Sequence, residues 1–122
     1  MTTSLLELAA IIVDCADPRP VAEFYLAATG GEVVRADPDG MWIKFGGNDV
    51  IFRRVEAYRP PTWPSNDEQM QVHLDFYVDD LHAAREQLER IGAKTSEHQP
   101  HGQSDLLVML DPAGRPFCIG PR

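Results

Sequence analysis

The stretch from Gln71 to Leu81 constrains the fold more than any other part of the chain, because it predicts a strand that runs directly into a helix. Side chains along a strand alternate between its two sides. The residues predicted on the apolar side are Val72, Leu74, Phe76 and Val78. The residues predicted on the other side are Gln71, His73, Asp75 and Tyr77. An imidazole, a carboxylate and a phenol side by side suit a lined cavity, so we look for function on this face.

The first part of the chain predicts a strand, a helix and three further strands. Leu5 to Asp14 is near-continuously apolar, which predicts a strand buried on both faces. Asp17 is a suitable N-cap for a helix that runs to about Thr29. The apolar stripe of this helix is predicted to be Val21, Phe24, Tyr25 and Ala28. Turn signals then separate predicted strands at 32–36, 41–45 and 50–55.

The same order of elements returns after a segment rich in proline. Residues 57–69 hold Pro60, Pro61 and Pro64, which exclude a central strand and indicate a linker. The strand from Met70 to Val78 follows, and Asp79 or Asp80 caps a helix. The apolar stripe of this second helix is predicted to be Leu81, Ala84, Leu88 and Ile91. The last three predicted strands are 93–99, 104–110 and 116–119.

The chain therefore predicts an α+β fold of two tandem βαβββ modules, at about 4–56 and about 70–120, within a single domain over 1–122. An offset of about 63 residues places Ala10 under His73 and Asp17 under Asp80. Two such modules side by side would form two curved sheets, with helices on the outer faces and a cleft between the sheets.

Net charge and cysteine spacing limit the partners and the cellular compartment that we expect. A formal net charge of -8 argues against a nucleic-acid partner and is compatible with a cationic small ligand. Neither a membrane-spanning run nor a signal peptide is evident in the sequence, so we expect a cytoplasmic protein. Cys15 and Cys118 belong to no CxxC pattern, which indicates two reduced thiols.

Three segments carry a resemblance to a known family: His73 to Leu81, Gly92-Ala93, and Asp111 to Cys118. They resemble the vicinal oxygen chelate superfamily, which includes glyoxalase I, bleomycin-resistance proteins, fosfomycin-resistance enzymes and extradiol dioxygenases. The nearest likeness is to compact bacterial glyoxalase-like proteins. The resemblance implies a homodimer and, in members that use a metal, ligands on the cavity faces of the first and last strands of each module.

Carried over position by position, this resemblance implies an incomplete set of metal ligands. His73 fits the first-strand position of module two, whereas Ala10 at the matching position of module one cannot bind a metal. Cys118 stands where catalytic members usually have Glu, and its counterpart in module one is predicted to be Arg53, or Phe52 after a one-residue slip. A third protein ligand would have to come from Asp75 or Asp14.

The first hypothesis is therefore a protein that binds a small organic molecule without the standard metal. Its cleft would be lined by His73, Asp75, Tyr77, Arg53 and Cys118, with Trp63 as a lid. The alternative is a metal-dependent lyase, isomerase or dioxygenase-type enzyme, with the metal on His73 and recruited carboxylates. Metal-free catalysis by His73 as a general base is a third option.

Structural roles compete with these functional ones. His73 could be a strand histidine that hydrogen-bonds Asp75 or Tyr77, and Cys118 could be a small buried residue rather than a nucleophile. His98 and His101 fit either a two-histidine metal clip or a solvated turn.

Overall fold

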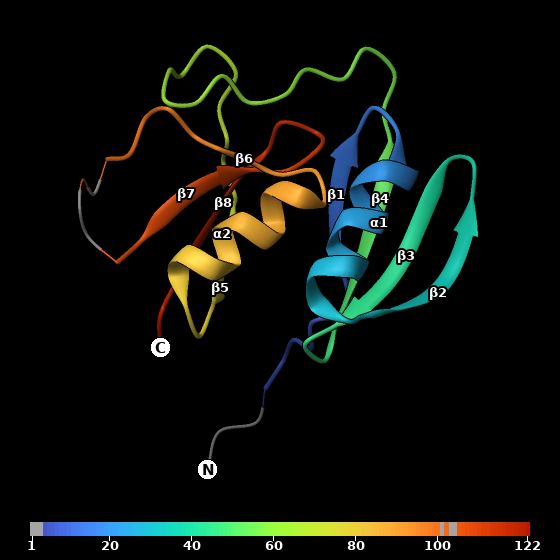
Figure 1. The fold of residues 1–122 in the computed structure, drawn as a ribbon. Coiled ribbons are helices and arrows are strands. Elements are labelled where there is room, and N and C mark those ends of the chain that lie inside the picture. The colour runs from blue at the N-terminus through green and yellow to red at the C-terminus, as the bar shows by residue number, and fades with distance from the viewer. Residues whose placement is uncertain (1–3, 101, 103–104) are drawn as a thin grey trace. The chain divides into compact units, whose positions relative to one another are not determined.

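The computed structural model describes residues 4–100, 102 and 105–122. It divides the chain into two compact units, Met1–Glu56 (unit 1) and Ala57–Arg122 (unit 2). Each unit contains one four-stranded sheet and one helix (Figure 1), so the predicted α+β fold with two βαβββ modules is confirmed. The cleft between the two modules stays a prediction.

Unit 1 contains one parallel and two antiparallel strand pairs. Its elements are β1 (Ile11–Cys15), α1 (Pro18–Thr29), β2 (Glu32–Asp37), β3 (Gly40–Phe45) and β4 (Asn48–Arg54). The strand order is β1-β4-β3-β2, in which β1 runs parallel to β4 and the other pairs are antiparallel. The Asp17 carboxylate caps α1 by accepting from the Arg19 backbone N–H at 3.3 Å, and Gly30 ends the helix with a φ of 69°.

Helix α1 packs on one face of this sheet. The Tyr25 ring stacks at 5.5 Å from the Phe52 ring, and both side chains are buried. Ala28, predicted in the apolar stripe, is exposed, and Ala22 is buried in its place, because the face of α1 that meets the sheet is centred on the first two turns. The buried apolar side chains of unit 1 are Cys15, Val21, Ala22, Phe24, Tyr25, Met41, Ile43, Val50 and Phe52.

Unit 2 repeats this order with shorter strands. Its elements are β5 (Leu74–Tyr77), α2 (Leu81–Arg90), β6 (Lys94–Thr95), β7 (Leu107–Leu110) and β8 (Pro116–Gly120). The strand order is β5-β8-β7-β6, and β5 runs parallel to β8. The Asp80 carboxylate caps α2 by accepting from the Ala83 N–H at 3.0 Å. Asp111 closes the β7–β8 turn, because its carboxylate accepts from the Arg115 N–H at 3.0 Å.

Two predicted strands begin later than the sequence indicates. The prediction of a strand buried on both faces from Leu5 is wrong, because β1 begins at Ile11 and the Leu5 side chain is 95% exposed. The strand predicted from Met70 begins at Leu74, because Gln71 has a φ of 55°, which interrupts the extended backbone. As a result Val72 does not join the predicted apolar face and is 65% exposed.

The strand predicted over 93–99 is shortened to β6 (Lys94–Thr95), because the Gln99 side chain forms the hydrogen bonds to β7 that a longer strand would form with its backbone. The Gln99 amide donates to the Val108 carbonyl at 2.8 Å and accepts from the Val108 N–H at 3.0 Å. Residue 104, where the next strand was predicted to begin, and His101 of the suggested histidine clip lie outside the described residues. Within the described ranges, no helix is both long enough and apolar enough to cross a membrane.

Arg54 joins two connections of unit 1. Its guanidinium donates to the Pro38 carbonyl at 2.8 and 3.0 Å and to the Ala16 carbonyl at 2.9 Å. Ala16 lies between β1 and α1, and Pro38 lies in the turn between β2 and β3. These charge-assisted hydrogen bonds hold the two connections together.

We predict that Arg54→Ala lowers the free energy of unfolding by about 1–3 kcal/mol, because two carbonyl groups lose a charged donor. The matched control is Arg53→Ala, since the Arg53 guanidinium is 60% exposed and pairs with the Asp14 carboxylate on the surface. Its loss should cost less than about 1 kcal/mol. Urea unfolding of both variants measures the difference, and equal losses would contradict the structural role of Arg54.

Candidate functional site

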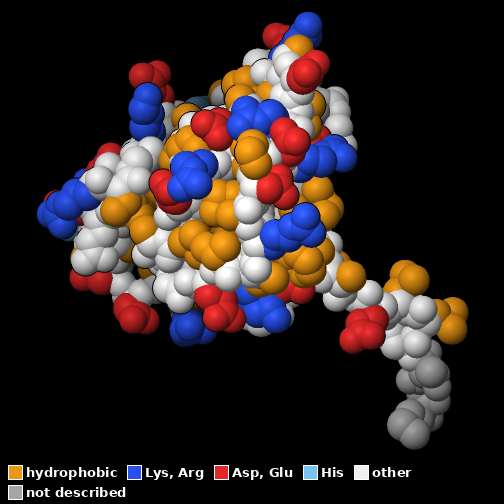
Figure 2. Space-filling model, turned by 90° about the vertical axis from the view of Figure 1, so that its right-hand side faces the viewer, with side chains coloured by type: hydrophobic (Ala, Val, Ile, Leu, Met, Phe, Trp, Pro, Cys, Tyr) orange, Lys and Arg blue, Asp and Glu red, His pale blue; other side chains and the backbone are white. Residues whose placement is uncertain are grey.

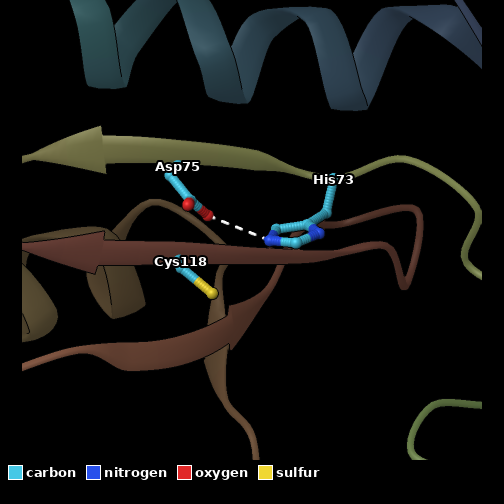
Figure 3. Close-up of side chains that lie close together, drawn as sticks. All are labelled: His73, Asp75 and Cys118. Atoms are coloured by element: carbon cyan, nitrogen blue, oxygen red, sulfur yellow. Dashed lines mark ion pairs between the residues drawn. The ribbon is translucent and has the colours of Figure 1, made fainter.

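Strands β5 and β8 bring three metal-type donors together in unit 2. Asp75 lies directly opposite Cys118 in the parallel register, so both side chains project from the same side of the sheet. His73 precedes β5 and reaches the same place. The donor atoms of these three residues lie within 4.8 Å of one another, and Figure 3 shows the three side chains converging. We call this group the β5–β8 cluster.

His73 and Asp75 form the exposed contact of the cluster. His73 Nε2 lies 3.0 Å from Asp75 Oδ1, and the side chains are 39% and 62% exposed. Nε2 is thus the ring nitrogen that faces the carboxylate, as the dashed line in Figure 3 marks. Of the two partners considered from the sequence, Asp75 rather than Tyr77 is the one that His73 contacts.

Cys118 is the buried member of the cluster, with 7% of its surface exposed. Burial raises the pKa of its thiol to about 11, and both the negative charge of Asp75 and a hydrogen bond with the Asp75 carboxylate add to the shift. A buried thiol beside a carboxylate stays protonated at neutral pH. This favours the structural role for Cys118 over the nucleophilic one.

The cluster fits a divalent metal by the kind and number of its donors. Catalytic zinc sites keep three protein ligands of the His, Cys or carboxylate type and one open position. His73, Asp75 and Cys118 meet that count, and Asp75 is the third ligand that the sequence required. A metal would have to displace the proton of Cys118, however, and the raised pKa of this thiol opposes that loss.

The other predicted site residues lie outside this cluster. Tyr77 is 69% exposed, and the Arg122 guanidinium lies 5.1 Å from its ring centroid. Trp63 sits in the loop before β5, where its ring meets the His98 ring edge-on at 5.1 Å. Arg53 belongs to unit 1 and pairs there with Asp14. The structure thus brings together three of the six predicted lining residues.

The strand register corrects the predicted counterpart of Cys118. The capping residues Asp17 and Asp80 confirm the 63-residue offset between the units, which places Ile12 under Asp75. Ile12 pairs with Ile51, just as Asp75 pairs with Cys118.

Ile51, rather than Arg53 or Phe52, therefore occupies the position in unit 1 that Cys118 occupies in unit 2. Unit 1 has an apolar pair, Ile12 and Ile51, where unit 2 has Asp75 and Cys118. The pair of polar groups at this position is thus specific to unit 2.

Unit 1 contains a hollow that the sequence did not predict, with a volume of about 470 Å³. Its lining residues are Asp17, Arg19, Ala36, Asp37, Pro38, Met41 and Arg54. They come from α1, β2, β3, β4 and the connections beside them, so no local motif in the sequence indicates the hollow. Its Arg54 guanidinium already donates to the Ala16 and Pro38 carbonyls, which assigns that group a structural role.

The family comparison agrees with the fold. Residues 10–120 match the family described as glyoxalase-like domain. The chain therefore belongs to the glyoxalase-like domain family, and with it to the vicinal oxygen chelate superfamily that the sequence resembles. No curated protein matches the chain.

Solved structures share the fold at low sequence identity. A glyoxalase family protein from Enterococcus faecalis is 18% identical, with a TM-score of 0.67 and coverage of 95% of this chain and 98% of its own. The fosfomycin resistance protein FosX from Listeria monocytogenes is 12% identical, with a TM-score of 0.72 and coverage of 98% and 95%. A bleomycin-binding protein from Streptomyces verticillus, complexed with copper(II)-bleomycin, is 18% identical, with a TM-score of 0.58 and coverage of 98% and 99%. These likenesses show the fold alone.

The protonation state of Cys118 gives a direct prediction. With a pKa of about 11, about one thiol in a thousand is ionised at pH 8, against about one in ten for a thiol of pKa 9.0. Iodoacetamide should therefore alkylate Cys118 about 100-fold more slowly in the folded protein than in urea. Mass spectrometry of the digested protein follows Cys118 separately from Cys15.

Asp75→Asn removes the negative charge beside the thiol and leaves the burial, which is the larger cause of the shift. Alkylation of Cys118 at pH 8 should become several-fold faster in this variant but stay slower than in urea. Alkylation of folded wild-type Cys118 at the rate of an ordinary thiol would contradict the account of the cluster.

Proposed function

We propose that this protein binds a small organic molecule on the cluster-bearing face of the unit 2 sheet, without a resident metal and without catalysing a reaction. Three lines of support meet here. The chain belongs to a glyoxalase-like family, a bleomycin-binding protein shares its fold, and the β5–β8 cluster presents polar groups on one face. Of these, the geometry of the cluster carries the proposal.

The observation that carries it is that the three donors already contact one another. The Asp75 carboxylate lies 3.0 Å from His73 Nε2 and hydrogen-bonds the Cys118 thiol. The contact with the thiol requires a proton on the sulfur, and a bound metal would replace that proton. The arrangement is therefore suited to a protonated, metal-free site.

The expected ligand carries hydrogen-bond donors or a positive charge. The His73 ring, which is 39% exposed, offers nitrogen atoms for hydrogen bonding, and the exposed Asp75 carboxylate supplies negative charge. A formal net charge of -8 favours the approach of cations. Tyr77 and Trp63 are proposed as aromatic contacts at the margins of the site, with Trp63 as a lid. Arg53 is proposed as a contact from unit 1.

The remaining parts of the proposal concern partners and compartment. We propose a homodimer that binds no nucleic acid, because the net charge of -8 is the opposite of what phosphate binding needs. We propose a cytoplasmic location, because Cys15 and Cys118 are both buried thiols that form no disulfide, as is usual in a reducing compartment.

A second candidate function is favoured by the donor count of the cluster. In a metal-dependent lyase, isomerase or dioxygenase-type enzyme, His73, Asp75 and Cys118 would hold the ion. A divalent metal bound there would supply Lewis-acid polarisation of a vicinal oxygen pair. Asp14, the other carboxylate considered from the sequence, pairs with Arg53 in unit 1 and is not a member of this donor group.

Metal content separates the two functions. Protein purified without added metal or chelator should contain well under one equivalent of divalent metal, and calorimetric titration with zinc, nickel or manganese should show no stoichiometric site. His73→Ala tests the cluster, and His82→Ala is the matched control, because His82 is 72% exposed and pairs with Glu86 on α2. One equivalent of metal that is lost in His73→Ala but kept in His82→Ala would establish the enzyme candidate instead.

A thermal-shift screen of small amines, amides and polyols tests binding itself. A ligand at about 100 times its Kd stabilises the folded state by about 2.7 kcal/mol, which is readily detected as a rise in Tm. We predict hits whose shifts are lost in both His73→Ala and Asp75→Asn and are kept in His82→Ala. Hits that are unaffected by these two substitutions would place ligand binding elsewhere.

A further inference from the structure

The hollow of unit 1 lies on the side of its sheet that α1 covers. Arg54 and Phe52 are two residues apart on β4, so their side chains project from the same face of the sheet. The Phe52 ring stacks on the Tyr25 ring of α1, which identifies this face as the helix-covered one. Ile51, which occupies the position of Cys118, projects from the opposite face. The hollow is therefore separate from the surface of unit 1 that corresponds to the cluster-bearing face of unit 2.

Arg54 fixes two walls of the hollow. One wall is the start of α1 with Asp17, and the other is the β2–β3 turn with Pro38. The Arg54 guanidinium donates to the Asp17 carboxylate at 3.5 Å and to the Pro38 carbonyl at 2.8 Å. The hollow is thus formed in advance, and its volume of about 470 Å³ is within the range of small-molecule sites. A ligand would not have to order these connections on binding.

The buried part of the lining is apolar. Met41 is 5% exposed, and Ala36 and Pro38 add further apolar surface beside it. Contact with such a surface removes hydrocarbon from water. This part of the hollow therefore favours a ligand with a short hydrocarbon body.

The charged residues of the lining are of both signs: Asp17, Asp37, Arg19 and Arg54. Figure 2 shows the side of the molecule on which β2 lies in Figure 1, where acidic and basic side chains are intermixed around hydrophobic ones. The two hydrogen bonds that the Asp17 side chain accepts from described residues both end on Oδ1. Asp37 accepts from the Asp39 N–H through Oδ1, and its Oδ2 has a long contact with Arg35 at 3.8 Å. The Oδ2 atoms of both carboxylates can therefore accept from an ammonium group.

The Arg19 guanidinium supplies the positive charge that a ligand can reach. Its side chain is 71% exposed, and its Nη1 pairs with the Glu23 carboxylate at 3.2 Å. An exposed pair of this kind contributes little to stability, so Arg19 can turn toward an anionic group in the hollow. Arg54 differs, because its guanidinium already donates to backbone carbonyls.

We propose that this hollow binds a small zwitterion, an apolar amino acid, whose ammonium group and carboxylate share one short hydrocarbon body. The ammonium group donates to Asp17 and Asp37, and the carboxylate accepts from Arg19. The hydrocarbon body packs on Met41. The lining holds two acidic and two basic residues, so a ligand without net charge matches it better than an ion does. The site lies in unit 1, so it is independent of the β5–β8 cluster and of the ligand proposed to bind there.

Isothermal titration calorimetry of the full chain with L-leucine tests the proposal. We predict one saturable site per chain. Isoamylamine lacks the carboxylate and isocaproate lacks the ammonium group, and both should bind at least about tenfold more weakly, because a charged group of the site loses its partner. The three compounds share the same hydrocarbon body, so the comparison isolates the two charged groups. An analogue that binds as tightly as L-leucine would overturn the zwitterion. The absence of saturable binding of L-leucine, L-valine and L-methionine up to about 10 mM would overturn the site.

Two substitutions test where the amino acid binds. Asp37→Asn should weaken L-leucine binding at least about tenfold. Its matched control is Asp39→Asn, because Asp39 lies in the same turn, is 90% exposed and does not line the hollow. Arg19→Gln should weaken binding about threefold. Its matched control is Arg90→Gln, because the exposed Arg90 guanidinium also pairs with a glutamate one helical turn away.

Both control variants should bind L-leucine as the wild type does, and circular dichroism checks that each variant is folded. L-leucine binding that is unchanged in both Asp37→Asn and Arg19→Gln would overturn the assignment to this hollow.

Discussion

The Asp75 carboxylate is the group on which the polar chemistry of unit 2 depends. It lies opposite Cys118 in the parallel pairing of β5 with β8, and its Oδ1 lies 3.0 Å from His73 Nε2. Its charge is also one reason why the pKa of the Cys118 thiol is raised to about 11. One side chain thus contacts an imidazole nitrogen and helps burial to keep a thiol protonated, and its contact with the thiol depends on the strand register.

Unit 1 has the same architecture without this chemistry. Its helix cap Asp17 corresponds to Asp80, and its β1–β4 pairing corresponds to that of β5 with β8. The positions that hold Asp75 and Cys118 in unit 2 hold Ile12 and Ile51 in unit 1. A fold that supports many activities leaves function to such individual positions, so family membership alone does not assign a reaction to this chain.

The features predicted correctly from the sequence are those that depend on a few neighbouring residues. The two helix starts follow from Asp17 and Asp80, and the β7–β8 turn follows from Asp111, because each carboxylate bonds backbone groups a few residues away. The register between strands that are far apart in the sequence could not be predicted from such local patterns. A slip of two residues keeps every side chain on the same face, so the alternation that suggested Arg53 could not distinguish it from Ile51.

The same limit applies to burial and to strand length. The apolar pattern of residues 5–14 is equally consistent with a buried strand and with an uncovered segment, since the pattern does not say what covers it. The pairing of the Gln99 side chain with the Val108 backbone shortens β6 through a tertiary contact that leaves no periodic trace. His73, Asp75 and Cys118 were nevertheless predicted as one site, because strand alternation and the family resemblance both pointed to them.

The most direct test of the central claim is the state of the two His73 ring nitrogens, measured by two-dimensional ¹⁵N–¹H NMR of the protein as purified. The account predicts that neither nitrogen binds a metal and that Nε2 is the nitrogen in contact with the Asp75 carboxylate. The Asp75→Asn variant should therefore change the chemical shift of Nε2 more than that of Nδ1. A ring with its proton on Nδ1 and with Nε2 bound to a metal would contradict the account and favour the enzyme.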